Sequence, residues 1–551
     1  MPSFNSIVAG MRQSVADAVF EARVLHEAGV IGPVRPDKAA KIGSTFIRWG
    51  ASPATGIATA AIHHPHETFI VDELGSLSFE RVHRRSNALA NSFAAMGIGY
   101  GDGIGVMCRN HRGFIETTLA AAKLGASALY LNTMFAGPQL VEVMEREGPK
   151  ALVYDEEFAG LLDGLNGGVE HIVAWTDGPS ESKTLESLIA AGDDSDLKPP
   201  PDKPRFVILT SGTTGTPKGA QRSSPDGLLM MAAIIDKIPY RSRETMMIAA
   251  PLFHSWGFFH FVVSLPTAST IVLRRRFDPE QTLQATEDYR AQVLAVVPVM
   301  VQRILQLPEE TLAKYDLSSL RITSISGSAL PGELALEWMD RFGDSVYNLY
   351  GSTEVSWATV ATPEDLRAAP GTAGRPPRGT TVRLYDDDGR EVPRGEVGRI
   401  FVGNDMSFEG YTGGGGKEIM DGLLSSGDVG HFDAAGRLFV DGRDDEMIVS
   451  GGENVFPREV EDLLADHDGV VEVAVIGVED DEYGQRLKAF VVAAAEVEVS
   501  EEELKAHVKS NLAGYKAPRE VEFLDELPRN ATGKVLKREL HDREAQAQSS
   551  G

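Results

Sequence analysis

The stretch of this chain best suited to chemistry is VILTSGTTGTPKGA, residues 207–220. An apolar run, which predicts a strand, leads into a loop built almost wholly from Ser, Thr and Gly, with one lysine, Lys218. Glycines let backbone amides close around an anion, and hydroxyl and ammonium groups add further donors. We therefore predict that the loop binds a polyphosphate; a merely flexible connection is the alternative.

The order of residues in this loop differs from that of the common P-loop. The P-loop places Gly before the lysine and Ser or Thr after it, whereas Pro217 and Gly219 occupy those places here. A second glycine-rich stretch, residues 99–105, lacks the spacing of a dinucleotide-binding loop and is predicted to be a turn. The sequence therefore indicates a phosphate site of another kind.

The loop opens an ordered set of motifs that resembles the adenylate-forming superfamily, which contains acyl-CoA synthetases, nonribosomal-peptide adenylation domains and beetle luciferases. The motifs that follow the loop are PLFH (251–254), SGSALP (326–331), NLYGSTE (348–354), SSGDVG (425–430), GRDDEMIVSGGENVFPREVE (442–461) and PRNATGKVLKREL (528–540). The resemblance covers residues 68–540. It implies a large N-terminal α/β body with a small β-rich subdomain, residues 1–442, and a small mobile α+β C-terminal domain, residues 443–551.

The resemblance also implies a site for ATP and Mg²⁺. Glu354 and Thr210 would bind the metal, which prefers oxygen ligands. Asp428 would accept hydrogen bonds from both ribose hydroxyls, and Arg443 would hold the ribose or a phosphate. The implied phosphate loop comprises Thr210, Ser211, Gly212, Thr213, Thr214, Gly215 and Lys218. The implied contacts to the adenine, the α-phosphate and the acyl end are Gly327, Ser328, Ala329, Tyr350 (stacked on the adenine), Gly351, Ser352 and Thr353 (bonded to the α-phosphate).

Two alternating steps follow from the same resemblance. Lys534 would be carried by the mobile domain to the carboxylate and bridging oxygens during adenylation, and Asp445 would be the hinge. Rotation at the hinge would withdraw Lys534 and bring Gly451 and Gly452 beside a channel for the pantetheine arm of coenzyme A. The chain carries Glu453 where some relatives have a basic residue, which leaves the contacts to the coenzyme A phosphates open.

Aromatic residues around the PLFH motif predict the wall of an acyl pocket; a buried aromatic cluster is compatible with that role. The predicted wall comprises Phe253, His254, Trp256, Phe258, Phe259 and, from another motif, Gly327. The implied catalytic groups are Lys534, Thr353, Glu354 and His254. Three consecutive arginines, at residues 274–276, predict an ion-paired or solvated edge, and a basic lip that collects anionic acids is the alternative.

Alternating strand-like and helix-like segments must position these motifs. Their order over residues 68–155 and 205–350 predicts parallel strands joined by crossover helices, and residues 381–402 change to short strands with tight turns. A further compact unit is predicted after residue 446. Pro457 suits the first turn of its first helix, and Ser500 with Glu503 predicts a capping box. The C-terminal EAQAQSSG is expected to fray.

Composition narrows the classes of function. A formal net charge of −27 over 551 residues argues against a general nucleic-acid binder and against strong attraction to an anionic membrane. The single cysteine, Cys108, excludes an internal disulfide, fits a reducing cytosol and is predicted to be buried. Residues 4–19 predict a helix docked on the body, with a membrane-surface helix as the alternative. No stretch is apolar enough to span a bilayer, so a cytoplasmic location is expected, with peripheral membrane contact left open.

The expected activity is that of an ATP-dependent acyl-CoA ligase. It would convert a carboxylic acid, preferably a fatty acid, into acyl-AMP and pyrophosphate and then into acyl-CoA and AMP. Its partners would be small molecules: the acid, ATP and coenzyme A. A ligase that loads a carrier protein and a non-catalytic nucleotide or acyl binder are the alternatives. The sequence leaves the acid and the oligomeric state open.

Overall fold

The computed structural model describes residues 4–165, 167–202, 205–210, 218–222, 228–406, 408–412, 414–450, 453–480, 484–494, 497, 499–530 and 533–550. Predicted site residues that lie outside this part of the chain are Ser211, Gly212, Thr213, Thr214, Gly215, Gly451 and Gly452.

The body contains two large sheets, whose parallel strands confirm the predicted α/β class. The eight-stranded sheet has the order β14 (Ser356–Ala361), β13 (Val346–Ser352), β12 (Ile322–Ile325), β11 (Val293–Val296), β9 (Thr245–Ile248), β10 (Thr270–Leu273), β1 (Thr68–Asp72), β2 (Gly75–Ser78). The seven-stranded sheet has the order β17 (Phe408–Tyr411), β8 (Lys218–Arg222), β7 (Phe206–Thr210), β4 (Ser127–Tyr130), β3 (Gly103–Met107), β5 (Ala151–Asp155), β6 (Glu170–Trp175). The antiparallel pairings described in these two sheets are β1 with β2, β13 with β14, β7 with β8, and β8 with the edge strand β17.

The described helices of the body include those that connect the parallel strands, as the alternating pattern predicts, and three that precede the first strand. They are α1 (Phe4–Glu27), α2 (Pro36–Trp49), α3 (Pro53–His63), α4 (Phe79–Ala95), α5 (Arg112–Leu124), α6 (Gly137–Glu147), η1 (Glu156–Leu161), α7 (Leu185–Ala191), α8 (Leu229–Lys237), α9 (Ser255–Ser264), α10 (Pro279–Asp288), α11 (Pro298–Leu305), α12 (Glu309–Leu312), α13 (Gly332–Phe342) and α14 (Pro363–Ala368). Cys108 is buried beside this framework, as predicted.

A smaller antiparallel sheet completes the body. It comprises β15 (Thr381–Tyr385), β16 (Gly398–Gly403), β19 (Leu423–Phe432), β18 (Ile419–Met420) and β20 (Leu438–Arg443), which pairs with β19. This is the predicted β-rich subdomain. The single turn η2 (Asp444–Glu446) then leads into the last part of the chain.

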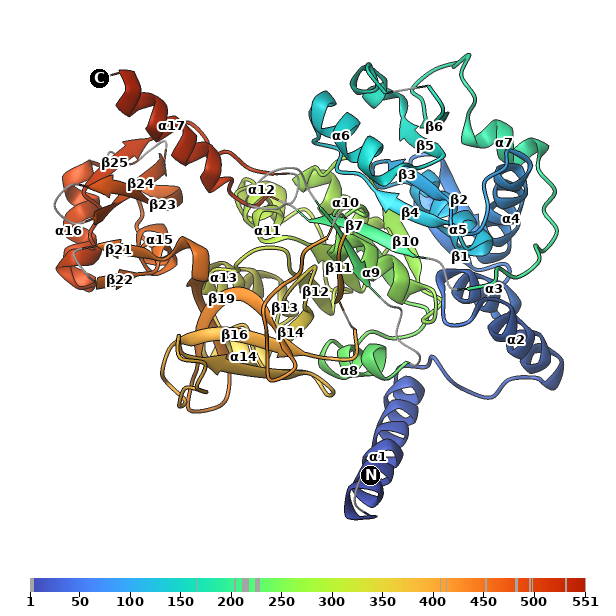
Figure 1. Cartoon of the computed structure of the whole chain (residues 1–551), viewed down its shortest axis with the longest axis horizontal. Helices are drawn as coiled ribbons and strands as arrows, with labels where there is room; N and C mark the ends of the chain where they lie inside the picture. The colour runs from blue at the N-terminus through green and yellow to red at the C-terminus, as the bar shows by residue number, and fades with distance from the viewer. Residues whose placement is uncertain are drawn as a thin grey trace.

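The C-terminal part has its own sheet and core and lies at one side of the body (Figure 1). Its elements are β21 (Ile448–Ser450), β22 (Glu453–Val455), α15 (Pro457–Ala465), β23 (Val470–Asp480), β24 (Gly484–Ala493), α16 (Glu501–Asn511), η3 (Gly514–Lys516), β25 (Glu520–Phe523) and α17 (Lys537–Ser550). Pro457 stands in the first turn of α15, and the Ser500 side chain caps α16 by accepting from the Glu503 amide. The tail does not fray as expected: α17 continues to Ser550, and Glu544 pairs with the buried Lys488 at 2.5 Å.

Two surface features bear on the alternatives left open by the sequence. The helix predicted over residues 4–19 forms as part of α1, but the docked part lies further along: Val24 and Leu25 are buried and Arg23 lies 3.2 Å from Asp236 of α8. Val15 and Val19 are exposed, and the first half of α1 extends away from the body (Figure 1). In the arginine triple, Arg275 and Arg276 both form ion pairs with Glu157. The ion-paired edge is therefore the correct interpretation for these two arginines.

Candidate active site

One cavity of about 1990 Å³ is lined by both the body and the C-terminal domain. It brings together residues from every motif that the structure describes, although these motifs are spread over more than three hundred positions. The predicted site residues that line it are Lys218, His254, Trp256, Phe258, Gly327, Ser328, Ala329, Tyr350, Gly351, Ser352, Thr353, Glu354, Asp428, Arg443 and Lys534. Of the remaining described positions, Thr210 ends β7 and Asp445 lies in η2.

Strand pairing places Asp428 and Arg443 together. They are directly opposite in the antiparallel β19–β20 pair, and Arg443 Nη1 lies 3.3 Å from Asp428 Oδ1. The other oxygen, Oδ2, accepts from the Tyr350 hydroxyl at 2.5 Å. Burial raises the pKa of Asp428, while the neighbouring Arg443, Tyr350 and Lys534 act in the opposite direction. The result is a carboxylate fixed in position by two donors at one end of the cavity.

Glu354 is held at the turn between β13 and β14. Its Oε2 accepts from the Ser352 hydroxyl at 2.9 Å, and its Oε1 accepts from the Tyr411 hydroxyl at 2.7 Å. The Lys218 ammonium lies 5.7 Å from the centre of the Tyr411 ring. Gly351 is required here, since a Cβ at this position would lie 2.0 Å from the Ser356 carbonyl oxygen. The turn thus presents a carboxylate, the donor type that Mg²⁺ prefers.

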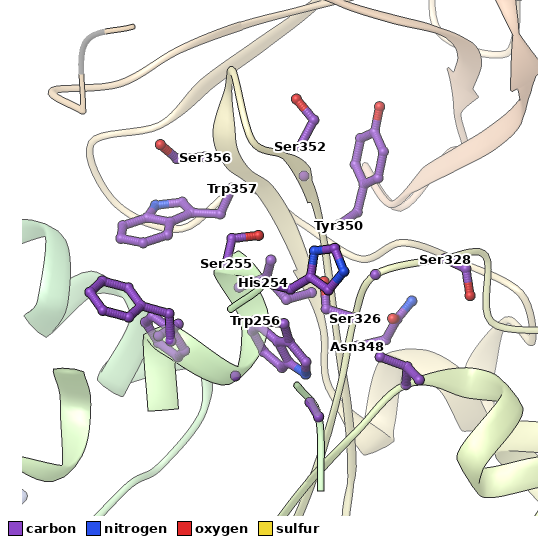
Figure 2. A pocket seen from close by; sticks show the side chains of 18 of the residues that line it. His254, Ser255, Trp256, Ser326, Ser328, Asn348, Tyr350, Ser352, Ser356 and Trp357 are labelled. Carbon is purple, nitrogen blue, oxygen red and sulfur yellow. The ribbon is translucent and has the colours of Figure 1, made fainter. Parts of the chain in front are cut away.

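The other end of the cavity is aromatic. Trp256 and Phe259 stack with ring centres 5.5 Å apart, and the Trp256 indole N–H donates to the Val296 carbonyl at 3.1 Å. His254 immediately precedes α9 and faces the cavity beside Tyr350 and Ser326 (Figure 2). Burial lowers the pKa of His254 to about 4, so the ring is neutral at physiological pH. Phe253, by contrast, packs in the hydrophobic core rather than in the cavity wall, which corrects its predicted place.

Gly327 joins the two ends. It follows β12 with a positive φ of 101°, a conformation that favours glycine. A Cβ here would lie 3.3 Å from Val297 Cγ1. The neighbouring Ser328 and Ala329 line the same cavity (Figure 2 labels Ser328). The SGSALP motif therefore contributes backbone and small side chains where the aromatic and polar regions meet.

Lys534 reaches the cavity from the C-terminal domain. Its loop is closed by hydrogen bonds from the Asn530 amide to the Lys534 carbonyl and from the Lys534 amide to Asn530 Oδ1, both 2.9 Å. The preceding Gly533 lies so close to α11 that a Cβ would approach Val299 Cγ1 to 2.1 Å. A second contact, from Gln302 Nε2 to the Val471 carbonyl at 3.1 Å, joins the same two parts. Glycine thus permits the close approach that places Lys534 near Asp428.

Known proteins resemble this chain over most of its sequence. A sequence model described as AMP-binding enzyme matches residues 57–412, and one described as AMP-binding enzyme C-terminal domain matches residues 459–534. A feruloyl-CoA synthase from an Amycolatopsis species is 35% identical over 492 residues, covering 87% of this chain and 96% of that protein. The chain belongs to the AMP-binding enzyme family.

The names of two further relatives indicate the reaction that the family catalyses. The fatty acid–[acyl-carrier-protein] ligase ScoC from Streptomyces coeruleorubidus is 30% identical, with 89% of this chain and 96% of ScoC covered. The structure of o-succinylbenzoate CoA synthetase from Bacillus subtilis with its acyl-adenylate intermediate matches with a TM-score of 0.76 at 26% identity, over 88% and 97% of the two chains. The protein is an ATP-dependent, AMP-forming acid–CoA ligase of the adenylate-forming superfamily.

The ligase anchors the two flanks of Asp445 differently. On one side, Asp444 accepts from Arg399 Nε of the body at 2.9 Å. On the other, Glu446 lies 3.0 Å from the ammonium of Lys537, at the start of α17 in the C-terminal domain. Asp445 therefore lies between an ion pair to the body and an ion pair within the C-terminal domain.

Sequence reasoning missed some of the residues that hold this site. Tyr411 fixes Glu354, and Ser426 accepts from the Tyr350 hydroxyl at 3.2 Å while its own hydroxyl donates to the Ile400 carbonyl. Ser426 lies within the SSGDVG motif, so its neighbourhood carried a signal. Tyr411 lies outside the motifs, and only its place before a glycine run could have drawn attention to it. In the described part of the ligase, no helix is both long and apolar enough to cross a membrane.

Proposed function

We propose that this ligase activates an apolar, fatty-type carboxylic acid and transfers its acyl group to coenzyme A. The supporting observation is the cavity itself, because Lys534 and the pair Asp428–Arg443 line one end while Trp256 and Phe258 line the other. In the first step a carboxylate oxygen attacks the α-phosphate of ATP, and the bond to pyrophosphate breaks. In the second step the thiolate of coenzyme A attacks the acyl carbon, and AMP leaves.

The polar end suits the nucleotide. The Asp428 carboxylate, oriented by Arg443 and Tyr350, is proposed to receive the two ribose hydroxyls. The ring of Tyr350 would stack on the adenine, and Thr353 would donate to the α-phosphate. The loop that contains Ser211 and Thr213 is proposed to surround the β- and γ-phosphates. ATP binding follows from family membership and is consistent with the ATP-bound RpMatB-BxBclM chimera, 28% identical with a TM-score of 0.79.

The donor set at Glu354 fits Mg²⁺. Both carboxylate oxygens are oriented by hydroxyl groups of Ser352 and Tyr411, and the side chain lines the cavity. We propose Glu354 with Thr210 as the protein ligands, the remainder coming from phosphates and water, as Mg²⁺ binding in nucleotide sites generally requires. When bound, the ion would neutralise phosphate charge during adenylation.

Lys534 is proposed to be the catalytic residue of adenylation. The Lys534 ammonium acts electrostatically on Asp428, the proposed ribose-binding carboxylate, and would stabilise the charge that develops between the acid and the α-phosphate. For the second step we propose rotation at Asp445, which would remove Lys534 and bring Gly451 and Gly452 to the pantetheine arm. The anchors Arg399–Asp444 and Lys537–Glu446 support this position of the hinge.

A pyrophosphate-release screen tests the proposal directly. The acids should include straight-chain, aryl and amino acids, each assayed with and without coenzyme A, and mass spectrometry should identify the thioester. The expected result is pyrophosphate release with apolar acids and formation of acyl-CoA. Similarity to ScoC makes a carrier protein the second candidate acceptor. An acyl-adenylate that persists with coenzyme A but moves to an acyl carrier protein would establish that candidate instead.

A further inference from the structure

The cavity follows one face of α9 away from the nucleotide. Ser255, Phe258, Phe259, Val262, Leu265 and Pro266 line it along this face and just beyond its end, and Trp256, Gly257 and Val263 of the same helix also contribute to the lining. Steps of three and four residues place the first six on one side of a helix. Because α9 has 10 residues, this stripe is roughly 15 Å long. The aromatic wall near His254 is therefore only the first part of a longer apolar channel.

The far end of the stripe meets the N-terminal helices. Gly56 of α3 lies against the end of the stripe, where a Cβ would approach the Leu265 Cβ to 2.8 Å. The cavity lining continues onto this segment through Ile31, Val34, Ile42, Phe46, Thr59 and His63. The family sequence model starts only at residue 57. Most of this distal wall thus comes from a part of the chain that the family match does not include.

The distal end is open to solvent and apolar at its rim. Ile31, Val34 and Phe46 line the cavity and yet are 42%, 38% and 45% exposed. The charged side chains beside them are already engaged, since Arg243 Nε and His64 Nδ1 lie 3.1 and 3.0 Å from the two oxygens of Glu67. An apolar tail therefore fits this end better than a second carboxylate does.

We infer that the acyl channel runs the length of α9 and opens between residues 29–34 and α2, so that the N-terminal segment selects acids with a long apolar chain. This inference rests on the proposed function and assigns its substrate class. Each further methylene buried along the stripe strengthens transition-state binding by about threefold to fourfold. An open rim also means that a tail longer than the channel projects into solvent instead of being rejected.

The first test places a charge at the rim. For each enzyme, kcat/KM for pyrophosphate release is measured with hexanoate, decanoate and hexadecanoate. In the wild type, kcat/KM should rise at least about tenfold from hexanoate to hexadecanoate. Phe46→Glu should lower the value for hexadecanoate about tenfold and leave hexanoate within about twofold. Ile47→Glu is the matched control, because Ile47 is 90% exposed and lies outside the described cavity lining.

The second test blocks the channel inside the protein. Thr59 of α3 lines the cavity, and its hydroxyl is buried without a hydrogen-bond partner among the described residues. Thr59→Trp should move the optimum to a shorter acid, whereas Thr59→Val, which keeps the volume, should retain the wild-type profile. Thermal melts of both Thr59 variants distinguish a blocked channel from a damaged fold. Phe46→Glu tests the same channel at its exposed rim, where the substitution does not disturb the core.

The outcomes separate the inference from the proposed function. Absence of pyrophosphate release with every acid would contradict the proposed function. Activity confined to aryl or short acids, or an equal loss at all chain lengths in Phe46→Glu, would overturn the inference while leaving the ligase activity intact. A loss restricted to the long acids in Phe46→Glu and Thr59→Trp, with both controls unchanged, supports it.

Discussion

The two ends of the cavity are built from different interactions. At the nucleotide end, Tyr350, Asp428 and Arg443 form one hydrogen-bonded group, and Glu354 is fixed by Tyr411 in another. At the acyl end, ring contacts such as Trp256–Phe259 predominate, and His254 is neutral. Hydrogen bonds fix the direction of a group, whereas apolar contacts fix only shape and volume.

This difference corresponds to what each end has to recognise. The nucleotide is the same in every turnover, so fixed donors and acceptors are an advantage there. The acid differs among relatives, two of which are named for ferulate and for fatty acids. In a wall of aromatic rings and aliphatic side chains, substitutions can change specificity for the acid through the volume of the pocket and leave the residues around the phosphates unchanged. The comparison predicts that substitutions at one end affect ATP and the first chemical step, and that those at the other affect the acid.

The largest expected effect is at Lys534. In Lys534→Ala, adenylation measured by pyrophosphate release should fall by on the order of 10²–10³, because one electrostatic contact made in the transition state is lost. Supplied with presynthesised acyl-AMP and coenzyme A, the same variant should stay within about tenfold of the wild type.

Asp445→Pro is the converse variant for that experiment. A fixed φ should hinder rotation at this position, so thioester formation, which depends on that rotation, should slow more than adenylation. Equal losses in both half-reactions for Lys534→Ala, with an unchanged thermal melt, would contradict alternation between two domain positions.

A smaller effect is expected at Asp428, the proposed ribose-binding carboxylate. Asp428→Asn keeps the shape of the side chain but removes the charge that faces Arg443 and, under the proposal, the ribose hydroxyls. Charged hydrogen bonds contribute roughly 1.5–3 kcal/mol, so KM for ATP should rise about tenfold to a hundredfold while KM for the acid changes little. The matched control is Asp433→Asn, a turn carboxylate paired with Arg437 outside the cavity. A rise in KM for the acid equal to that for ATP would remove the functional separation between the two ends.

The sequence predicts which residues line the polar end of the cavity better than which residues line the acyl end. Asp428, Tyr350 and Lys534 lie in compact motifs, because phosphate and ribose chemistry requires particular donors on particular turns. The parallel sheets were also predictable, since short apolar runs alternate with helical patterns. Tyr411 was missed because its role depends on the pairing of β17 with β8, a contact between strands almost two hundred residues apart in the chain.

The acyl end depends on packing, which one sequence does not encode locally. Phe253 and Phe258 have the same chemistry and lie five residues apart, yet Phe253 is in the core and Phe258 in the cavity wall. The contribution of α2 and α3 was likewise invisible, because no motif marks residues 29–56. The fraying expected at the tail was wrong for a similar reason, since Lys488, on a distant strand, pairs with Glu544 in α17.

The smallest expected effect concerns His254, whose contribution to KM for the acid should not depend on pH. A histidine with an ordinary pKa near 6.5 changes charge between about pH 5 and pH 8, whereas burial lowers the pKa of His254 to about 4. The ratio of KM for the acid in the wild type to that in His254→Gln should therefore be constant over this range, since groups common to both enzymes cancel. The pKa of His254 is lower in the folded protein than in the unfolded chain. The contribution of the neutral ring to the free energy of unfolding is therefore complete above about pH 6.5 and declines as the pH falls toward 4. A midpoint near pH 6.5 in the ratio would show instead that His254 takes up a proton at neutral pH and that the acyl end is not free of charge.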